Sequence, residues 1–374
     1  NMAITKVSTA VVDMSGNTEG LVIAKGNDAQ RPVSPSIGMI RDNTETTPSK
    51  LEVYNSTGWQ YLKVGSQPLS ISYLCVAGGG AGGSYYYGGG GGAGGFLDGE
   101  ILEAPSSFTI TVGNGGSGSG NGQGGNGGNS SIVAAEITDI ISIGGGGGGG
   151  SASYSSSGKF GKNGGSGGGV SGFFQTNMAE GLGTAGQGFM SGSSWTSSVN
   201  YVNPVFNSST YLGSAWGSGG GGASERGHHS YWATDNALPG AGGDGLASNI
   251  TGTSTYYAGG GGGGFNANSG NNFGPYGSPG RAPGGLGGGG AGARGWFSST
   301  QAIAGTANTG GGGGAGSHTS AAAGKNGGSG IVILKYPDTY SSTKTGSLIS
   351  SVSTAVSGYK IETFTSGTGT ITFA

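Results

Sequence analysis

The stretch "ISIGGGGGGGSASY", residues 141–154, places seven consecutive glycines directly after an apolar run that is typical of a β-strand. Glycine loses more conformational freedom on folding than any other residue, so a flexible linker is the simplest interpretation of this run. The rest of the composition favours a packed structure instead. Gly accounts for 94 of the 374 residues and charged residues for only 9%, while 16 Tyr, 12 Phe and 5 Trp lie between the glycine runs. Disordered chains normally carry more charge and fewer aromatics than this.

Strand patterns precede or follow several glycine runs. Apolar side chains alternate from Leu69 to Cys75, and Phe108, Ile110 and Val112 are predicted to share one face of a strand. The unbroken apolar run "SGIVILKYP" (329–337) predicts a strand buried on both faces. The tail "GYKIETFTSGTGTITFA" (358–374) predicts a β-hairpin turning at "SGTG". No helical periodicity of convincing length occurs, so an all-β fold with essentially no α-helix is expected.

The glycine runs can build a regular structure of their own. They lie at 88–92, 144–150, 219–222, 259–264, 287–290 and 310–314. An extended polyglycine II helix resembles polyproline II, with three residues per turn and no internal hydrogen bonds, so its N–H and C=O groups point sideways. Neighbouring helices of this kind can pair these groups, and seven residues would span roughly 22 Å. We expect a bundle of such helices, and a flexible glycine-rich linker is the alternative.

Composition divides the chain into three parts. Residues 1–67 contain few glycines, and "GLVIAKG" (20–26) and "LEVYNSTGWQYLKV" (51–64) predict short strands joined by turns, so this part is expected to be a separate β-module. Residues 68–336 are the glycine-rich part with aromatic loops. Residues 337–374 are expected to close that domain as a C-terminal β-hairpin.

The aromatic segments between glycine runs are the candidates for binding. Rigid aromatic side chains supply contact area, and the Ser, Asn and Gly residues around them can adapt to a partner. The alternative is that these aromatics cap the bundle. The candidates are Tyr85, Tyr86 and Tyr87 in "SYYY"; Trp195, Tyr201 and Trp216; His228, His229, Tyr231 and Trp232 in "SERGHHSYWATDN"; Phe273 and Tyr276; and Arg294, Trp296 and Phe297 in "ARGWFSSTQ".

Several function classes find little support in the residues. The formal net charge is −2 and no Lys or Arg cluster lies among the aromatics, which argues against nucleic acid as a partner. Cys75 is the single cysteine, so no disulfide within the chain is possible. His228 and His229 are adjacent and far from His318, which is not metal-ligand spacing. We expect neither an enzyme nor a bound cofactor or metal, and no apolar run is long enough to predict insertion into a membrane.

The order of the motifs resembles a known family. "LCVAGGGAGG", "GGGGGAGGFLDG", "FTITVGNGG" and "GGSGIVILKYP" resemble the glycine-rich domain of phage tail-fibre and adhesin proteins, over residues 68–336. The stretch "GLVIAKGNDAQRPVSPSIGMIRDNTETTPSKLEVYNSTGWQYL" resembles a β-module of phage fibre shafts, and "MAITKVSTAVVDMSG" resembles the opening of such fibres. Related adhesins of T-even-like phages pack polyglycine helices into a sandwich whose loops bind the host surface.

The resemblance implies a phage tail-fibre adhesin located in the virion and acting outside the cell. Its partners would be a host cell-surface protein or glycan and, through the N-terminal module, other virion tail proteins. It also implies a homotrimer. A purely structural component of a virion or an extracellular filament is the alternative, and a glycan depolymerase is a more distant one.

Overall fold

The computed structural model describes residues 23–45, 50–61, 68–85, 87–120, 122–150, 157–172, 179–193, 216–230, 239–265, 281–295, 301–317 and 323–374. The described residues form an all-β fold, as expected, and contain no α-helix. Their helical turns are two short 3-10 segments, η1 (Asp28–Gln30) and η2 (Ser157–Lys159). The chain divides into two compact units, residues 1–67 and 68–374.

The first unit is a sheet of four short strands. Their order is β1 (Lys25–Gly26), β2 (Ile40–Asn43), β3 (Lys50–Asn55) and β4 (Gly58–Tyr61), with β1 parallel to β2 and the other pairs antiparallel. Its interior is polar, because the side chains buried among its described residues are those of Arg41, Asn43 and Glu52. Apolar burial therefore contributes little to the stability of the described part of this unit.

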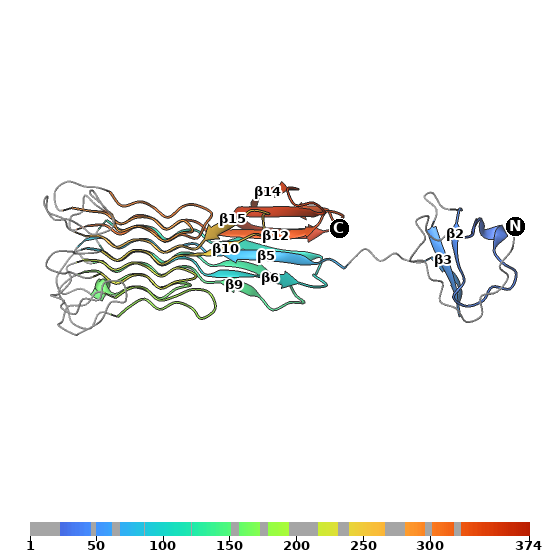
Figure 1. The fold of residues 1–374 in the computed structure, drawn as a ribbon, viewed down its shortest axis with the longest axis horizontal. Helices are drawn as coiled ribbons and strands as arrows, with labels where there is room; N and C mark the ends of the chain where they lie inside the picture. The colour runs from blue at the N-terminus through green and yellow to red at the C-terminus, as the bar shows by residue number, and fades with distance from the viewer. Residues whose placement is uncertain are drawn as a thin grey trace, which may run out of the picture. The chain divides into compact units, whose positions relative to one another are not determined.

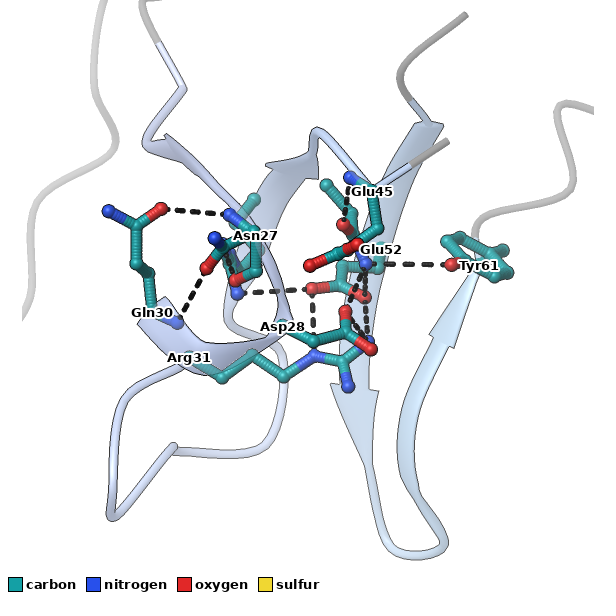
Figure 2. Close-up of polar contacts among 9 residues, drawn as sticks. Asn27, Asp28, Gln30, Arg31, Glu45, Glu52 and Tyr61 are labelled. Carbon is teal, nitrogen blue, oxygen red and sulfur yellow. Dashed lines mark hydrogen bonds and ion pairs between the residues drawn. The ribbon is translucent and has the colours of Figure 1, made fainter. Parts of the chain in front are cut away.

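Glu52 is the centre of this polar interior (Figure 2). Arg31 donates to both of its carboxylate oxygens, at 3.1 and 2.6 Å, and Asn43 donates to Oε2 at 3.0 Å. Arg41 approaches Oε1 to 3.4 Å. The hydrogen bond from Arg31 holds the pKa of the Glu52 carboxyl below its usual value, against the opposing effect of burial. A charged network thus occupies the place of an apolar core.

The second unit contains the strands of a large sheet. Their order is β6 (Phe96–Ile101), β5 (Ile71–Val76), β12 (Ile331–Pro337), β15 (Tyr359–Phe373), β7 (Ser107–Val112), β8 (Ser130–Val133) and β9 (Ile140–Ser142). β13 (Ser342–Lys344) and β14 (Ile349–Ser353) also pair with β15, and β10 (Leu246–Ser248) forms a separate pair with β11 (Thr255–Tyr257).

The prediction of a C-terminal hairpin at "SGTG" is wrong. β15 runs without reversal from Tyr359 to Phe373, and its first half pairs with β12 while its second half pairs with β7. Gly367 lies between the two halves with φ +94°. That backbone conformation is readily available to glycine, so the "SGTG" segment lets one strand pass from β12 to β7 instead of turning back.

β12 is buried on both faces, as the sequence predicts. Val332, Leu334 and Tyr336 pack with Phe108, Ile110, Ile132 and other residues of β5, β7, β8 and β15. Ile331 and Ile333 pack on the opposite face with Phe96, with Tyr257 of β11, and with Ile250 and Ala258 beside the β10–β11 pair. The strands therefore lie in three layers, and Phe108, Ile110 and Val112 share one core as expected.

The glycine runs extend from these strands side by side (Figure 1). Run 77–84 shows how they pair. Its residues 77, 80 and 83 donate to run 88–95, residues 78, 81 and 84 donate to run 122–129, and residues 79 and 82 donate to run 323–330. Every third residue thus meets the same neighbour, as three residues per turn require. The expected polyglycine II bundle is present.

Run 88–95 occupies the centre of the bundle. Its N–H and C=O groups bond to six runs, and each of the six also bonds to the next, so that they close a ring around it: 77–84, 143–150, 166–172, 216–223, 258–265 and 310–317. Further runs surround the ring: 113–119, 122–129, 158–165, 179–184, 187–193, 225–230, 239–245, 281–286, 288–295, 301–306 and 323–330. This is hexagonal packing of polyglycine II helices.

Close approach explains why glycine is needed. A Cβ added at Gly91 would lie 2.1 Å from the carbonyl oxygen of Gly80, and one added at Gly147 would lie 2.1 Å from that of Gly124. Neither position could hold a side chain unless the runs moved apart. The seven glycines of 144–150 are all buried and hydrogen-bonded to neighbouring runs, so the linker interpretation is wrong for this stretch.

The runs that surround the ring leave one gap beside run 144–150. No described run lies between runs 122–129 and 158–165 at this place. Side chains take its place. Asn129 Oδ1 accepts from Gly144 N–H at 2.8 Å, and Asn126 Oδ1 accepts from Gly147 N–H at 3.0 Å. Lys162 Nζ donates to Gly124 O at 2.9 Å. These polar side chains satisfy backbone groups that another run would otherwise have paired.

Candidate functional site

The glycine runs bring together, at one end of the second unit, described residues that adjoin the predicted aromatic segments. Ser84 donates to Gly122 O, Gly172 to Tyr87 O, Gly217 to Gly264 O and Ser230 to Ser193 O, at 2.8 to 3.2 Å. These residues adjoin the candidate segments, and the strands lie at the other end of the same runs (Figure 1). We call these two ends the loop end and the strand end. Backbone pairing therefore gathers segments that are far apart in the sequence.

Part of the predicted site can be described. Tyr85, Tyr87, Trp216, His228, His229 and Arg294 belong to the described residues. The other candidates lie outside them: Tyr86, Trp195, Tyr201, Tyr231, Trp232, Phe273, Tyr276, Trp296 and Phe297.

Tyr85 and Tyr87 lie where run 77–84 passes into run 88–95. Both have left-handed backbone conformations, with φ of +65° and +60°. Such φ values are uncommon for residues other than glycine and cost free energy for a bulky side chain. In a chain that uses glycine so freely, tyrosine at these two positions indicates that the side chains themselves are needed. Tyr87 is 6% exposed and Tyr85 is partly buried.

Trp216 is buried at the loop end, with 7% of its surface exposed. Its ring packs edge-to-face against Phe265, with centroids 6.1 Å apart, and its carbonyl accepts from Ser230 Oγ at 2.7 Å. The two aromatics begin and end neighbouring inner runs, 216–223 and 258–265. Little of either side chain is exposed, which favours the capping alternative for Tyr87 and Trp216.

The two histidines differ in environment. His228 is exposed, and its Nε2 lies 3.3 Å from Glu225 Oε1. His229 is half-buried, and its Nδ1 accepts from Ser193 N–H at 3.0 Å and also contacts Ser193 Oγ. Burial, together with the nearby Arg226 charge, lowers the pKa of His229 to about 4. A neutral His229 therefore joins run 225–230 to run 187–193, while His228 has its imidazole at the surface.

Arg294 lies at the loop end of outer run 288–295, paired through a β-bridge with Phe265. It is partly buried. Among the described residues no group of three or more His, Cys, Asp or Glu could hold a metal ion. Among the described candidates, His228 is exposed and Tyr85 and Arg294 are partly buried; an imidazole, a phenol ring and a guanidinium are groups that can stack on or hydrogen-bond to a sugar or a polypeptide.

Two further residues support this end of the bundle: the sequence marks Phe265 only as one aromatic of a loop segment, and it does not single out Ser193. Phe265 directly follows the glycines 259–264 and is 1% exposed. Ser193 is 6% exposed and holds His229. Their position was the available signal, because an aromatic or small polar residue at the end of a glycine run packs against the end of a neighbouring run.

Comparison with known proteins identifies one family. A family model described as a glycine-rich domain matches residues 55–337. The search of curated proteins found no match, and the search of solved structures found none either. The matched range ends before β15, although this strand joins β12 to β7 in the sheet. No helix of the described residues is long and apolar enough to cross a membrane.

Proposed function

Because the chain belongs to the glycine-rich domain family, we propose that it is a phage tail-fibre adhesin which binds a host cell-surface protein or glycan through the segments at the loop end. One observation carries the proposal. Described residues that adjoin different aromatic segments pair with one another at one end of the bundle: Ser230 with Ser193, and Gly217 with Gly264 and Gly240. A rigid scaffold that presents clustered, variable segments is the usual arrangement of a recognition surface.

Among the described residues, Tyr85 and the exposed His228 contribute side chains to this surface. Tyr85 keeps an aromatic ring at a left-handed position that glycine would adopt without cost, which supports a role for the ring in contact. The protein acts without catalysis or cofactor in this proposal, as a homotrimeric part of the virion that is extracellular when it acts. The first unit would join it to other tail proteins.

A purely structural component is the second candidate. The burial of Tyr87 and Trp216 favours it, because these two candidate residues pack within the bundle end. In that case the loop end would have no receptor.

Binding of the fluorescently labelled protein to a panel of bacteria tests the proposal. Wild type is compared with a Trp232→Ala, Trp296→Ala double variant, with Tyr85→Gly, and with Tyr256→Ala as a matched aromatic control. Tyr256 is 47% exposed on β11, at the strand end. Saturable binding that is lost in the loop-end variants and kept in Tyr256→Ala supports an adhesin. Absence of binding across the panel favours the structural alternative, and binding that survives all variants contradicts the loop end as the site.

A further inference from the structure

A cavity of about 520 Å³ opens at the strand end, away from the aromatic segments. Its walls come from β5, β6, the turn between β8 and β9, and β9 itself, which lies near β6 (Figure 1). Apolar lining is provided by Leu97, Ile137 and Ile141, and polar lining by Tyr73, Glu100 and Asp139. A volume of this size is typical of sites that hold a ligand or a few side chains of a partner.

The walls of this cavity are fixed by the fold. Gln187 reaches it from the bundle, where its Nε2 donates to Ile141 O at 3.0 Å and its Oε1 accepts from Ile143 N–H at 2.8 Å. Glu100 Oε1 accepts from Ser70 Oγ at 2.9 Å. Ile141 nevertheless remains 40% exposed, so no described residue covers this apolar wall. The cavity is therefore preformed and open.

The charged residues that line the cavity are all acidic. Residues 64–158 contain no Lys or Arg, and their acidic residues are Asp98, Glu100, Glu103, Glu136 and Asp139. All of these carboxylates are exposed on β6 or in the turns that follow β6 and β8. Glu100 and Asp139 line the cavity itself, and no basic residue does. Their summed field attracts cations and disfavours anionic partners.

We propose that this cavity binds a basic, partly apolar segment of a partner protein. The ammonium or guanidinium group of its Lys or Arg pairs with Glu100 and Asp139, and the alkyl stem packs on Leu97, Ile137 and Ile141. Long basic side chains suit such a site because their stems bury against apolar walls while the charge stays near water. The site lies at the strand end, so it serves attachment to another protein and does not depend on host recognition at the loop end.

The test uses a fluorescein-labelled Lys-Leu-Lys-Leu-Lys-Leu amide as probe and measures anisotropy with the full chain. A Glu-Leu-Glu-Leu-Glu-Leu peptide is the charge-reversed control. We expect the Lys-Leu peptide to bind, more weakly at higher salt, and the Glu100→Gln, Asp139→Asn double variant to bind it about 5- to 20-fold more weakly. Asp338→Asn, an exposed acid outside the cavity, should leave binding unchanged.

Ile141→Lys places a competing cation at the cavity wall and should also weaken binding. Equal binding by wild type and the Glu100→Gln, Asp139→Asn variant would overturn the proposal, as would equal binding of the two peptides or no binding of the Lys-Leu peptide. Circular dichroism confirms that each variant is folded. Loss of host-cell binding in the Trp232→Ala, Trp296→Ala variant without loss of peptide binding would keep this site separate from the proposed adhesin site.

Discussion

Replacing Gly147 by alanine tests whether the glycine runs pack so closely that a side chain between them destabilises the protein. The added methyl group would lie 2.1 Å from Gly124 O and 2.6 Å from Gly124 C, whereas real Cβ contacts are essentially never shorter than 3.0 Å. Both atoms belong to the backbone of run 122–129, so no side chain can rotate away to relieve the clash. The two runs must therefore separate by almost 1 Å at this level.

The cost follows from the bonds that this separation strains. Gly124 N–H donates to Gly148 O at 2.9 Å, Gly147 N–H donates to Asn126 Oδ1 at 3.0 Å, and Gly127 N–H donates to Gly145 O at 2.9 Å. Losing two or three of them costs about 1 kcal/mol each, and overpacking adds about 1–3 kcal/mol. We expect a total loss of about 3–6 kcal/mol, which in a unit of this size lowers Tm by roughly 6–12 °C.

Differential scanning calorimetry of the full chain measures this loss, and Gly120→Ala is the matched control. Gly120 is exposed at the loop end, and a Cβ there meets nothing within 4 Å. The same glycine-to-alanine change should therefore alter Tm by no more than about 1 °C. If Gly147→Ala and Gly120→Ala melted at the same temperature, the close approach of runs 144–150 and 122–129 would be refuted.

Three further predictions concern other parts of the chain. Asn126→Ala removes the acceptor for Gly147 N–H and should lower the free energy of unfolding by about 1 kcal/mol. Amide hydrogen exchange in residues 144–150, measured by mass spectrometry, should become faster in this variant, whereas Asn126→Asp keeps an acceptor and should exchange as wild type does. Because the folded pKa of Glu52 lies below its unfolded value, its contribution to the stability of the first unit is complete above about pH 4.5 and is lost as the pH falls through the folded pKa. Calorimetry should therefore show a transition that shifts to lower temperature on acidification in wild type but not in Glu52→Gln; an equal shift in both would contradict this role. Burial raises the pKa of the Cys75 thiol to about 12, so iodoacetamide at pH 8 should leave the native chain unmodified and alkylate it in guanidinium chloride, and rapid native alkylation would argue against its buried place in β5.

The strand core was accessible from the sequence because local patterns determine it. Alternation places Ile71 and Cys75 in one core with Phe108, and the unbroken run 331–334 is buried on both faces of its sheet. The C-terminal hairpin was wrong for a reason that local patterns do not contain. "SGTG" has the composition of a turn, but β15 pairs with β12 and then with β7, two strands from earlier in the chain. Pairing with both requires β15 to continue through "SGTG" instead of turning back.

The candidate site could be predicted only as a set of segments. Their aromatic composition marks them, yet which segments lie together depends on the pairing of glycine runs, and a run without side chains carries almost no information about its partner. The burial of each aromatic side chain could not be predicted from the sequence either. Trp216 is buried because run 258–265 lies beside run 216–223 and supplies Phe265, a neighbour 49 residues further along the sequence.

The sequence of each glycine run nevertheless indicates whether the run lies inside the bundle or at its surface. The central run 88–95 has no residue larger than Ala93, because all its faces meet backbone. In the outer run 122–129 the larger residues are Gln123, Asn126 and Asn129, three positions apart, so that they share one face. Asn114 and Ser117 in run 113–119, and Asn326 and Ser329 in run 323–330, have the same spacing, although Ser119 and Lys325 in these runs lie off it. Large polar side chains fit on a face of a polyglycine II helix that has no neighbouring backbone, whereas enclosed runs hold smaller buried residues such as Val170 and Ser218. The spacing of polar residues within a glycine run therefore indicates how many of its three faces are enclosed, and it would separate inner from outer runs before any partner is known.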